Sequence, residues 1–131
     1  MSRPFHLAIP AGDLDAATSF YQNVLGCKLG NKEEGKWVDV DFWGNELTLH
    51  KTHTKLPKER HAVDMGSVSI PHFGAHLDKE VFERIKTNLK TNNIKYFDEP
   101  YVRFKGKEEE QETFFLEDPH GNVLELKTFS K

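Results

Sequence analysis

The strongest constraint on this chain is an internal repeat, because two stretches that begin about 66 residues apart show the same order of expected elements. Each stretch starts with a short strand, continues with a helix that has one apolar face, and ends with three strand-like segments. A unit of this length is too long for a solenoid of three or more repeats. The sequence therefore predicts an α+β fold in which two βαβββ modules pair their sheets.

In the first half, the expected strands cover residues 4–9, 27–32, 36–43 and 46–52. Asp13 is a natural N-cap for the helix after the first strand, since its carboxylate can accept a backbone N–H of the first turn. Apolar residues follow at helical spacing up to Leu25, and Gly26 is a typical stop. Glycines at positions 35 and 44 supply the turns between the later strands.

In the second half, the expected strands cover residues 67–77, 94–104, 111–117 and 122–129. Asp78 can cap a helix with Val81, Phe82, Ile85 and Leu89 on one face, and this helix ends at two consecutive asparagines. Residues 53–66 are polar and are expected to form a loop between the halves. We therefore expect one domain over residues 1–131, with modules at about 1–52 and 67–131 and a linker at 53–66.

The length, charge, hydropathy and cysteine count of the chain limit the classes of function that we expect of it. The 131 residues suit one domain, and 18 basic against 21 acidic side chains give a net charge of −3, which favours neither nucleic acid nor an anionic membrane as partner. No run of about 18 apolar residues is present, and the first residues do not resemble a signal peptide. The single Cys27 cannot form an internal disulfide, so a cytoplasmic location is expected.

Polar and apolar side chains alternate with period two along four of the expected strands. Aliphatic residues share one face, which we expect to meet the helices, and polar residues that could bind a metal share the other. His6, His72 and Glu125 lie on the polar faces. Two imidazoles and one carboxylate form a standard site for a divalent ion that leaves positions open for substrate or oxygen.

Each of these three residues also has an ordinary explanation. A single histidine in a strand is more often a hydrogen-bonded core or surface residue, and Glu125 alone could be a surface residue. The metal-site hypothesis therefore depends on the set. Its main support is that His6 and His72 occupy equivalent places in the two repeats.

Three segments together resemble the vicinal oxygen chelate superfamily, which includes glyoxalase I, extradiol dioxygenases, fosfomycin-resistance enzymes and bleomycin-binding proteins. HLAIPAGDLDAATSFYQNVLG is similar to the opening strand and helix of the family, and HFGAHLD to the start of the second module. FFLEDPHGNVLELK is similar to its closing DPxGxxxE motif. The resemblance covers essentially the whole chain and places His6, His72 and Glu125 at the ligand positions.

The resemblance implies paired βαβββ modules forming a curled mixed sheet around a metal-containing cleft. It also implies a small-molecule substrate and a homodimer that could exchange modules, since exposed sheet edges favour such pairing. One divalent metal is expected, with Fe(II) favoured and Zn, Ni, Mn or Co as alternatives. A binding protein that sequesters a small ligand would need no metal, so the His-His-Glu set counts against it.

His50 is the candidate catalytic residue. Aligning GNELTLH with GNVLELK on their Gly-Asn turns puts Thr48 opposite Glu125, with His50 two residues further along the same face. There it could be the acid/base of an extradiol dioxygenase that acts on a small aromatic diol, since its ordinary pKa suits proton transfer at neutral pH. Alternatively, it could be a fourth ligand or the base of a glyoxalase-like lyase or isomerase.

This chain departs from the larger extradiol dioxygenases in the strand before the closing turn. Those enzymes carry a tyrosine there, whereas this chain has Phe114 and Phe115.

Further residues are candidates for contact with the substrate or with the metal ligands. Tyr101, Arg103 and Lys105 alternate along one expected strand, and Gln111 opens the next. A cationic row of this kind could hold a carboxylate or phosphate, although charges on an exposed edge strand also serve to block aggregation. His76, two strand positions beyond the second-half ligand candidate, could support the ligands or be an ordinary core histidine.

Overall fold

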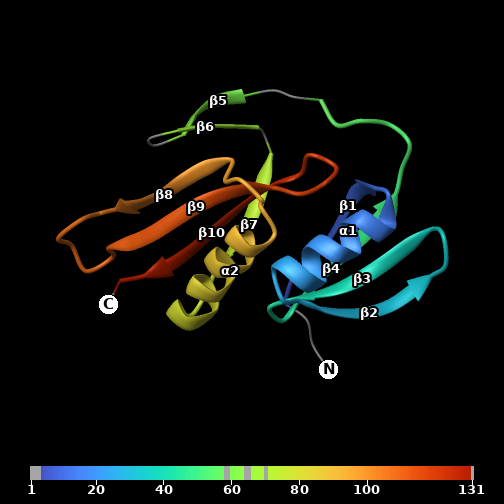
Figure 1. Ribbon diagram of the computed structural model, residues 1–131, viewed down its shortest axis with the longest axis horizontal. Helices are drawn as coiled ribbons and strands as arrows, with labels where there is room; N and C mark the ends of the chain where they lie inside the picture. The colour runs from blue at the N-terminus through green and yellow to red at the C-terminus, as the bar shows by residue number, and fades with distance from the viewer. Residues whose placement is uncertain (1–3, 58–59, 64–65, 70, 131) are drawn as a thin grey trace. The chain divides into compact units, whose positions relative to one another are not determined.

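The computed structural model describes residues 4–57, 60–63, 66–69 and 71–130, and it divides into two units (Figure 1). Unit 1 is Met1–Leu56 with Pro119–Gly121, and unit 2 is Pro57–Asp118 with Asn122–Lys131. Each unit contains a four-stranded mixed sheet and a helical segment that follows its first sheet strand. The predicted α+β class and the two βαβββ modules are therefore confirmed.

Unit 1 is built as the first repeat predicts. Its elements are β1 (His6–Gly12), α1 (Leu14–Ser19), η1 (Phe20–Val24), β2 (Lys28–Glu33), β3 (Trp37–Phe42) and β4 (Asn45–Lys51). The strand order is β1-β4-β3-β2, with β1 parallel to β4 and the other pairs antiparallel. The sheet is open and has β1 and β2 as its edges.

Unit 2 repeats this construction. Its sheet and helix are β7 (His72–His76), α2 (Lys79–Thr91), β8 (Asp98–Arg103), β9 (Gln111–Glu117) and β10 (Val123–Phe129). The order β7-β10-β9-β8 matches the order in unit 1 strand for strand, with β7 parallel to β10 and the other pairs antiparallel.

The segment between the modules differs from the prediction. Residues 53–66 were expected to be a loop, but β5 (Arg60–Val63) and β6 (Gly66–Ser69) pair in an antiparallel ladder. The same ladder interrupts the expected strand 67–77, since β6 ends at Ser69 and β7 begins at His72. A two-stranded ladder satisfies backbone groups of a polar segment without an apolar run, so hydropathy did not indicate it.

Each helix covers the apolar face of its own sheet. In unit 1, Ala17, Phe20, Tyr21 and Val24 are buried, as are Val38, Val40, Leu47 and Leu49 of the strands. In unit 2, the rings of Phe82 and Phe114 lie 4.8 Å apart, and Ile85 and Leu89 are buried beside them. The aliphatic and aromatic side chains larger than alanine each contribute about 1.5–3 kcal/mol by leaving water. The helix-covered face of each sheet is therefore the core, and the opposite face remains for function.

The helix ends agree with the sequence in part. The Asp13 carboxylate accepts the Asp15 N–H at 3.2 Å, and the turn ends at Gly26 with φ +81°. Asp78 is the N-cap residue of α2, but its side chain makes no capping hydrogen bond. From Phe20 onward the first helix continues as a π-helix. Among the described residues, no helix is long and apolar enough to cross a membrane.

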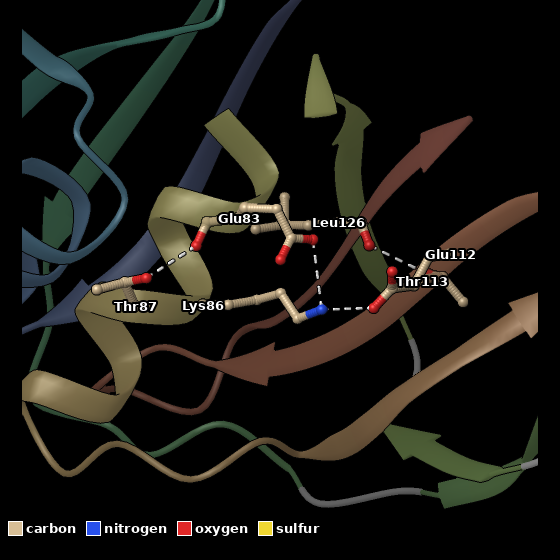
Figure 2. A network of polar contacts seen from close by, with 6 residues as sticks. All are labelled: Glu83, Lys86, Thr87, Glu112, Thr113 and Leu126. Carbon is tan, nitrogen blue, oxygen red and sulfur yellow. Dashed lines mark hydrogen bonds and ion pairs between the residues drawn. The ribbon is translucent and has the colours of Figure 1, made fainter. Parts of the chain in front are cut away.

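Lys86 joins α2 to β9 on the helix-covered side of unit 2. Its Nζ lies 2.6 Å from Glu112 Oε2 and 3.4 Å from Glu83 Oε2 (Figure 2). Burial lowers the pKa of Lys86, but the hydrogen bonds and charges of Glu112 and, to a smaller extent, Glu83 outweigh it and raise this pKa above its ordinary value. Glu112 therefore has a structural partner on the helix side, while its neighbour Thr113 faces the opposite side of the sheet.

Unit 1 also includes the turn Pro119–Gly121. The Thr52 hydroxyl oxygen accepts the Gly12 N–H at 3.1 Å and lies 3.3 Å from His120 Nε2. Gly12 has φ +67°, and a Cβ added there would lie 2.5 Å from His120 Nδ1. Gly12 is thus required both by its backbone conformation and by the close approach of the imidazole.

Candidate metal and substrate site

The strand register brings most of the candidate residues of unit 2 onto one face of its sheet. Paired residues of neighbouring strands share a face. The ladder pairs Val123 with His72, Glu125 with Gly74 and Lys127 with His76. The same face is continued on the other strands by Phe115, Thr113, Gln111, Tyr101 and Arg103. The predicted separation of aliphatic and polar faces is therefore correct for this unit.

Glu125 is the central acid of this face, and only 8% of its surface is exposed. The Thr113 hydroxyl donates to Glu125 Oε2 at 3.0 Å and is also within 3.2 Å of the Leu126 carbonyl oxygen. His72 Nε2 lies 3.6 Å from the other oxygen, Oε1. One carboxylate oxygen is thus held by a hydroxyl while the other faces an imidazole nitrogen.

Two positively charged side chains lie close to Glu125 Oε2, the oxygen that accepts the Thr113 hydroxyl. Lys127 Nζ lies 3.7 Å and Arg103 Nη1 4.0 Å from Glu125 Oε2, and about a quarter of each cationic side chain is exposed. Both distances exceed the 2.7–3.2 Å range of a hydrogen bond, so the attraction is electrostatic. The two cations therefore lie near Glu125 Oε2 without directing a close N–H at it.

His76 lies in the same row as Lys127, on the same face as His72. Its ring stacks on Phe129 with centroids 4.7 Å apart and an interplanar angle of 12°. Burial and the Lys127 charge lower the pKa of His76, although Glu125 opposes them, so His76 is mostly neutral at neutral pH.

The remaining candidates of unit 2 lie further along the same face or beyond it. Tyr101 pairs with Thr113, and Arg103 pairs with Gln111. Gln111 is 6% exposed; its Nε2 donates to the Glu109 carbonyl, whereas its Oε1 is buried without a hydrogen-bond partner among the described residues. β8 ends at Arg103, so Lys105 lies in the following turn and does not extend the cationic row.

In unit 1, His6 has a carboxylate partner. Its Nδ1 lies 2.7 Å from Glu46 Oε1, and the register places Glu46 directly opposite it on β4. A carboxylate on Nδ1 fixes the ring orientation and leaves Nε2 as the atom available to a metal. Both candidate histidines thus have their Nε2 as the candidate ligand atom, since His72 Nε2 faces Glu125.

The register also tests the alignment of the two Gly-Asn turns. Glu46, Thr48 and His50 pair with alternate residues of β1, as Val123, Glu125 and Lys127 pair with alternate residues of β7. Thr48 is therefore the counterpart of Glu125, as the sequence alignment predicted. Its hydroxyl donates to Asp39 Oδ1 at 2.7 Å. His50 is exposed and lies one row beyond Thr48, opposite Trp37.

The polar face of unit 1 also has a cavity. It measures ≈ 380 Å³ and is lined in part by Lys28, Asp39, Asp41 and Glu46. Glu46, the partner of His6, is thus one of the carboxylates that line this cavity.

The described residues fit a divalent metal in part. His6 belongs to unit 1, while His72 and Glu125 belong to unit 2, and among the described residues no group of three His, Cys, Asp or Glu side chains is close enough to hold an ion. Within unit 2, however, His72 Nε2 and Glu125 Oε1 are 3.6 Å apart. Two donors bound to one ion at about 2.1 Å stand roughly 3.4 Å apart at the tetrahedral angle, so this pair can ligate one metal.

Sequence reasoning did not identify four residues that support this site. Thr113 and Lys127 contact Glu125, Glu46 contacts His6, and Asp39 accepts the Thr48 hydroxyl. The alternation in WVDVDF and in NELTLH puts Asp39 and Glu46 on the polar side of their own strands, and the ladder between β3 and β4 brings the two sides onto one face. No local signal indicated which of these side chains would meet.

Comparisons with known proteins agree with the fold of two βαβββ modules described above. Residues 3–126 match the family described as Glyoxalase/Bleomycin resistance protein/Dioxygenase superfamily. No curated protein matches the chain significantly. A glyoxalase/bleomycin resistance protein/dioxygenase from Alicyclobacillus acidocaldarius is similar at 38% identity, covering 97% of this chain and 91% of that one, with a TM-score of 0.75.

Two further solved structures have the same fold. Lactoylglutathione lyase from Agrobacterium tumefaciens is 26% identical, covering 98% of this chain and 94% of that one, with a TM-score of 0.67. The fosfomycin resistance protein FosX from Listeria monocytogenes is 15% identical, covering 99% and 95%, with a TM-score of 0.71; at that identity it shows the fold alone.

Proposed function

Because the chain belongs to the glyoxalase/bleomycin resistance protein/dioxygenase superfamily, we propose that it is a metal-dependent enzyme in which His6, His72 and Glu125 hold one divalent ion. The observation that carries this proposal is the orientation of the three side chains. Glu46 lies on Nδ1 of His6, and Oε1 of Glu125 is the oxygen that faces His72 Nε2. Partners that fix the ligating atom in this way are typical of metal sites.

Of the activities in the family, we place ring cleavage of a small aromatic diol first. The supporting observation is Thr48, which stands where a second carboxylate would lie if both modules supplied one. A site with three protein ligands leaves positions open for a chelating diol and for O₂, and iron(II) supplies the oxygen chemistry of such sites. His50, one row beyond Thr48, would exchange a proton with the diol.

A second candidate is a lyase or isomerase that uses a non-iron metal. It is favoured by the 26% identity with a lactoylglutathione lyase. In this reaction the base would be His50 or one of the carboxylates on the polar face of unit 1, Asp39 or Glu46. A protein that only binds a small molecule remains the third candidate, and it requires no metal.

The test is metal content after anaerobic purification, combined with oxygen uptake against a panel of catechols. Iron near one per chain with O₂ consumption supports ring cleavage. Zinc, nickel, manganese or cobalt without O₂ uptake supports the lyase or isomerase, and absence of any metal contradicts metal dependence. His6→Ala, His72→Ala and Glu125→Ala should each lose the metal, whereas the exposed His53→Ala serves as a control that keeps it.

His50→Ala separates the two roles of that residue. Retained metal with lost turnover would make His50 an acid/base, and loss of metal would make it a ligand. The homodimer implied by the resemblance stays a prediction that light scattering in solution would check.

A further inference from the structure

Thr113 is a fully buried threonine on the polar face of unit 2, with an exposed fraction of 0%. The ladder pairs it with Lys127 on β10, which is two residues beyond Glu125 on the same face. Its hydroxyl reaches Glu125 diagonally across the two strands and donates to Oε2 at 3.0 Å. Because Thr113 is shielded from water, this hydroxyl depends on protein acceptors for its hydrogen bond.

The hydroxyl of Thr113 has a single hydrogen and two acceptors within reach. These are Glu125 Oε2 at 3.0 Å and the Leu126 carbonyl oxygen at 3.2 Å. A hydrogen bond to a carboxylate oxygen is shorter and stronger than one to a neutral carbonyl, so the hydrogen is directed mainly at Oε2. The carboxylate of Glu125 is therefore held by one of its two oxygens.

The two oxygens of Glu125 have different surroundings. Oε2 accepts the Thr113 hydroxyl and has Lys127 Nζ at 3.7 Å and Arg103 Nη1 at 4.0 Å. Oε1 lies 3.6 Å from His72 Nε2, the other candidate ligand in this unit. A divalent cation at Oε2 would meet two positive charges, whereas at Oε1 it would meet an imidazole that can bind it. These surroundings favour a metal at Oε1.

We propose that Thr113 is a positioning residue that makes Glu125 bind the metal through Oε1 alone. A carboxylate can bind a metal through one oxygen or through both, and the second mode takes up two coordination positions. By holding Oε2, Thr113 leaves the second of these positions open for the substrate or for oxygen. This inference deepens the proposed function and rests on it, because it requires Glu125 to be a ligand.

The visible spectrum of bound Co²⁺ tests how Glu125 binds. Protein freed of metal with EDTA is titrated with Co²⁺, and the absorption is expressed per bound ion after equilibrium dialysis. The visible bands of Co²⁺ weaken as more ligand atoms surround the ion, so binding by a second carboxylate oxygen reduces them. We expect Thr113→Val, which removes the hydroxyl and keeps the shape of the side chain, to lower this absorption roughly twofold or more.

Two further variants make the result specific. Thr113→Ser keeps the hydroxyl and should retain the absorption per ion of the unaltered protein. Thr128→Val is the matched control, because Thr128 is a threonine of β10 with 2% exposure whose ladder partner Glu112 places it on the helix-covered side of the sheet. It should also leave the absorption unchanged. A merely structural role of Thr113 would change stability without changing the absorption per bound ion.

The outcomes separate this inference from the proposed function. If the unaltered protein binds no Co²⁺, the proposed function and the inference both fail. If it binds Co²⁺ in a way that requires His72 and Glu125, but Thr113→Val gives the same absorption per ion, the inference fails alone.

A second measurement decides the question if Thr113→Val does not fold. Infrared difference spectra are recorded between metal-free and Zn²⁺-loaded unaltered protein that carries ¹³C-labelled glutamate. Binding through one oxygen separates the asymmetric and symmetric carboxylate stretches more widely than binding through both. A wide separation supports the inference, and a narrow one overturns it.

Discussion

At Gly74, a single added methyl group should push apart β7 and β10, the two strands that carry His72 and Glu125. It lies opposite Glu125 in the parallel ladder between β7 and β10, and an added Cβ would stand 1.6 Å from the Glu125 backbone oxygen. Ordinary contact begins near 3.4 Å. The obstructing atom is backbone, so Gly74→Ala requires β7 to move by about 1.8 Å, the difference between these distances.

The cost follows from the ladder that this movement disturbs. A hydrogen bond of about 2.9 Å lengthened by that amount is lost, and each lost bond costs roughly 0.5–1.5 kcal/mol. Displacing β7 disturbs the ladder that pairs it with β10, and we take roughly two or three bonds as lost. Replacing glycine by alanine also lowers the conformational entropy of the unfolded chain, which offsets the loss by about 0.4–1 kcal/mol. We therefore expect the free energy of unfolding to fall by about 2–3 kcal/mol.

Urea unfolding followed by far-UV circular dichroism measures this change, and Zn²⁺ titration should show weaker binding because His72 and Glu125 lie on the displaced strands. Gly30→Ala is the matched control. Gly30 is also a strand glycine, but the nearest atom to its added Cβ is Asp39 Cβ at 3.4 Å, so its effect should stay within about 1 kcal/mol. If Gly74→Ala is as stable as the unaltered protein and binds metal equally well, the close approach of β7 and β10 is refuted.

Three further predictions concern other parts of the chain. Glu46→Ala should weaken Zn²⁺ binding about 10–100-fold by calorimetry, because His6 loses the carboxylate that orients it; unchanged affinity would separate Glu46 from the metal site. Burial raises the pKa of the Cys27 thiol from 9.0 to about 12, so its alkylation by iodoacetamide at pH 8 should be about a thousandfold slower in the folded than in the unfolded protein. Lys86→Met should reduce stability by about 1–2 kcal/mol at pH 8, since it leaves Glu112 without its partner. Because the folded-state pKa of Lys86 is raised, this stabilisation is complete below pH 10.5 and declines at higher pH, so equal losses at pH 8 and pH 11.5 would contradict the ion pair.

Most of the fold could be predicted from the sequence, because its signals are local. Helical spacing after Asp13 and Asp78 located both helices, and alternation located the strands of both sheets to within a few residues. The failures also have local causes. β5 carries no apolar alternation, and β6 was expected to be continuous with β7. The side chain of Asp78 makes no capping hydrogen bond, although aspartate is a favourable N-cap residue.

The sequence by itself determined the repeat, the two faces of each sheet and the equivalence of Thr48 with Glu125. These features follow from the period of two along a strand and from turns that fix where each strand begins. Only the tertiary structure decided that Thr113, Lys127 and Arg103 converge on Glu125, and that Glu46 is the partner of His6. Those contacts join residues of different strands, so they depend on ladder register and side-chain reach, which no local pattern specifies.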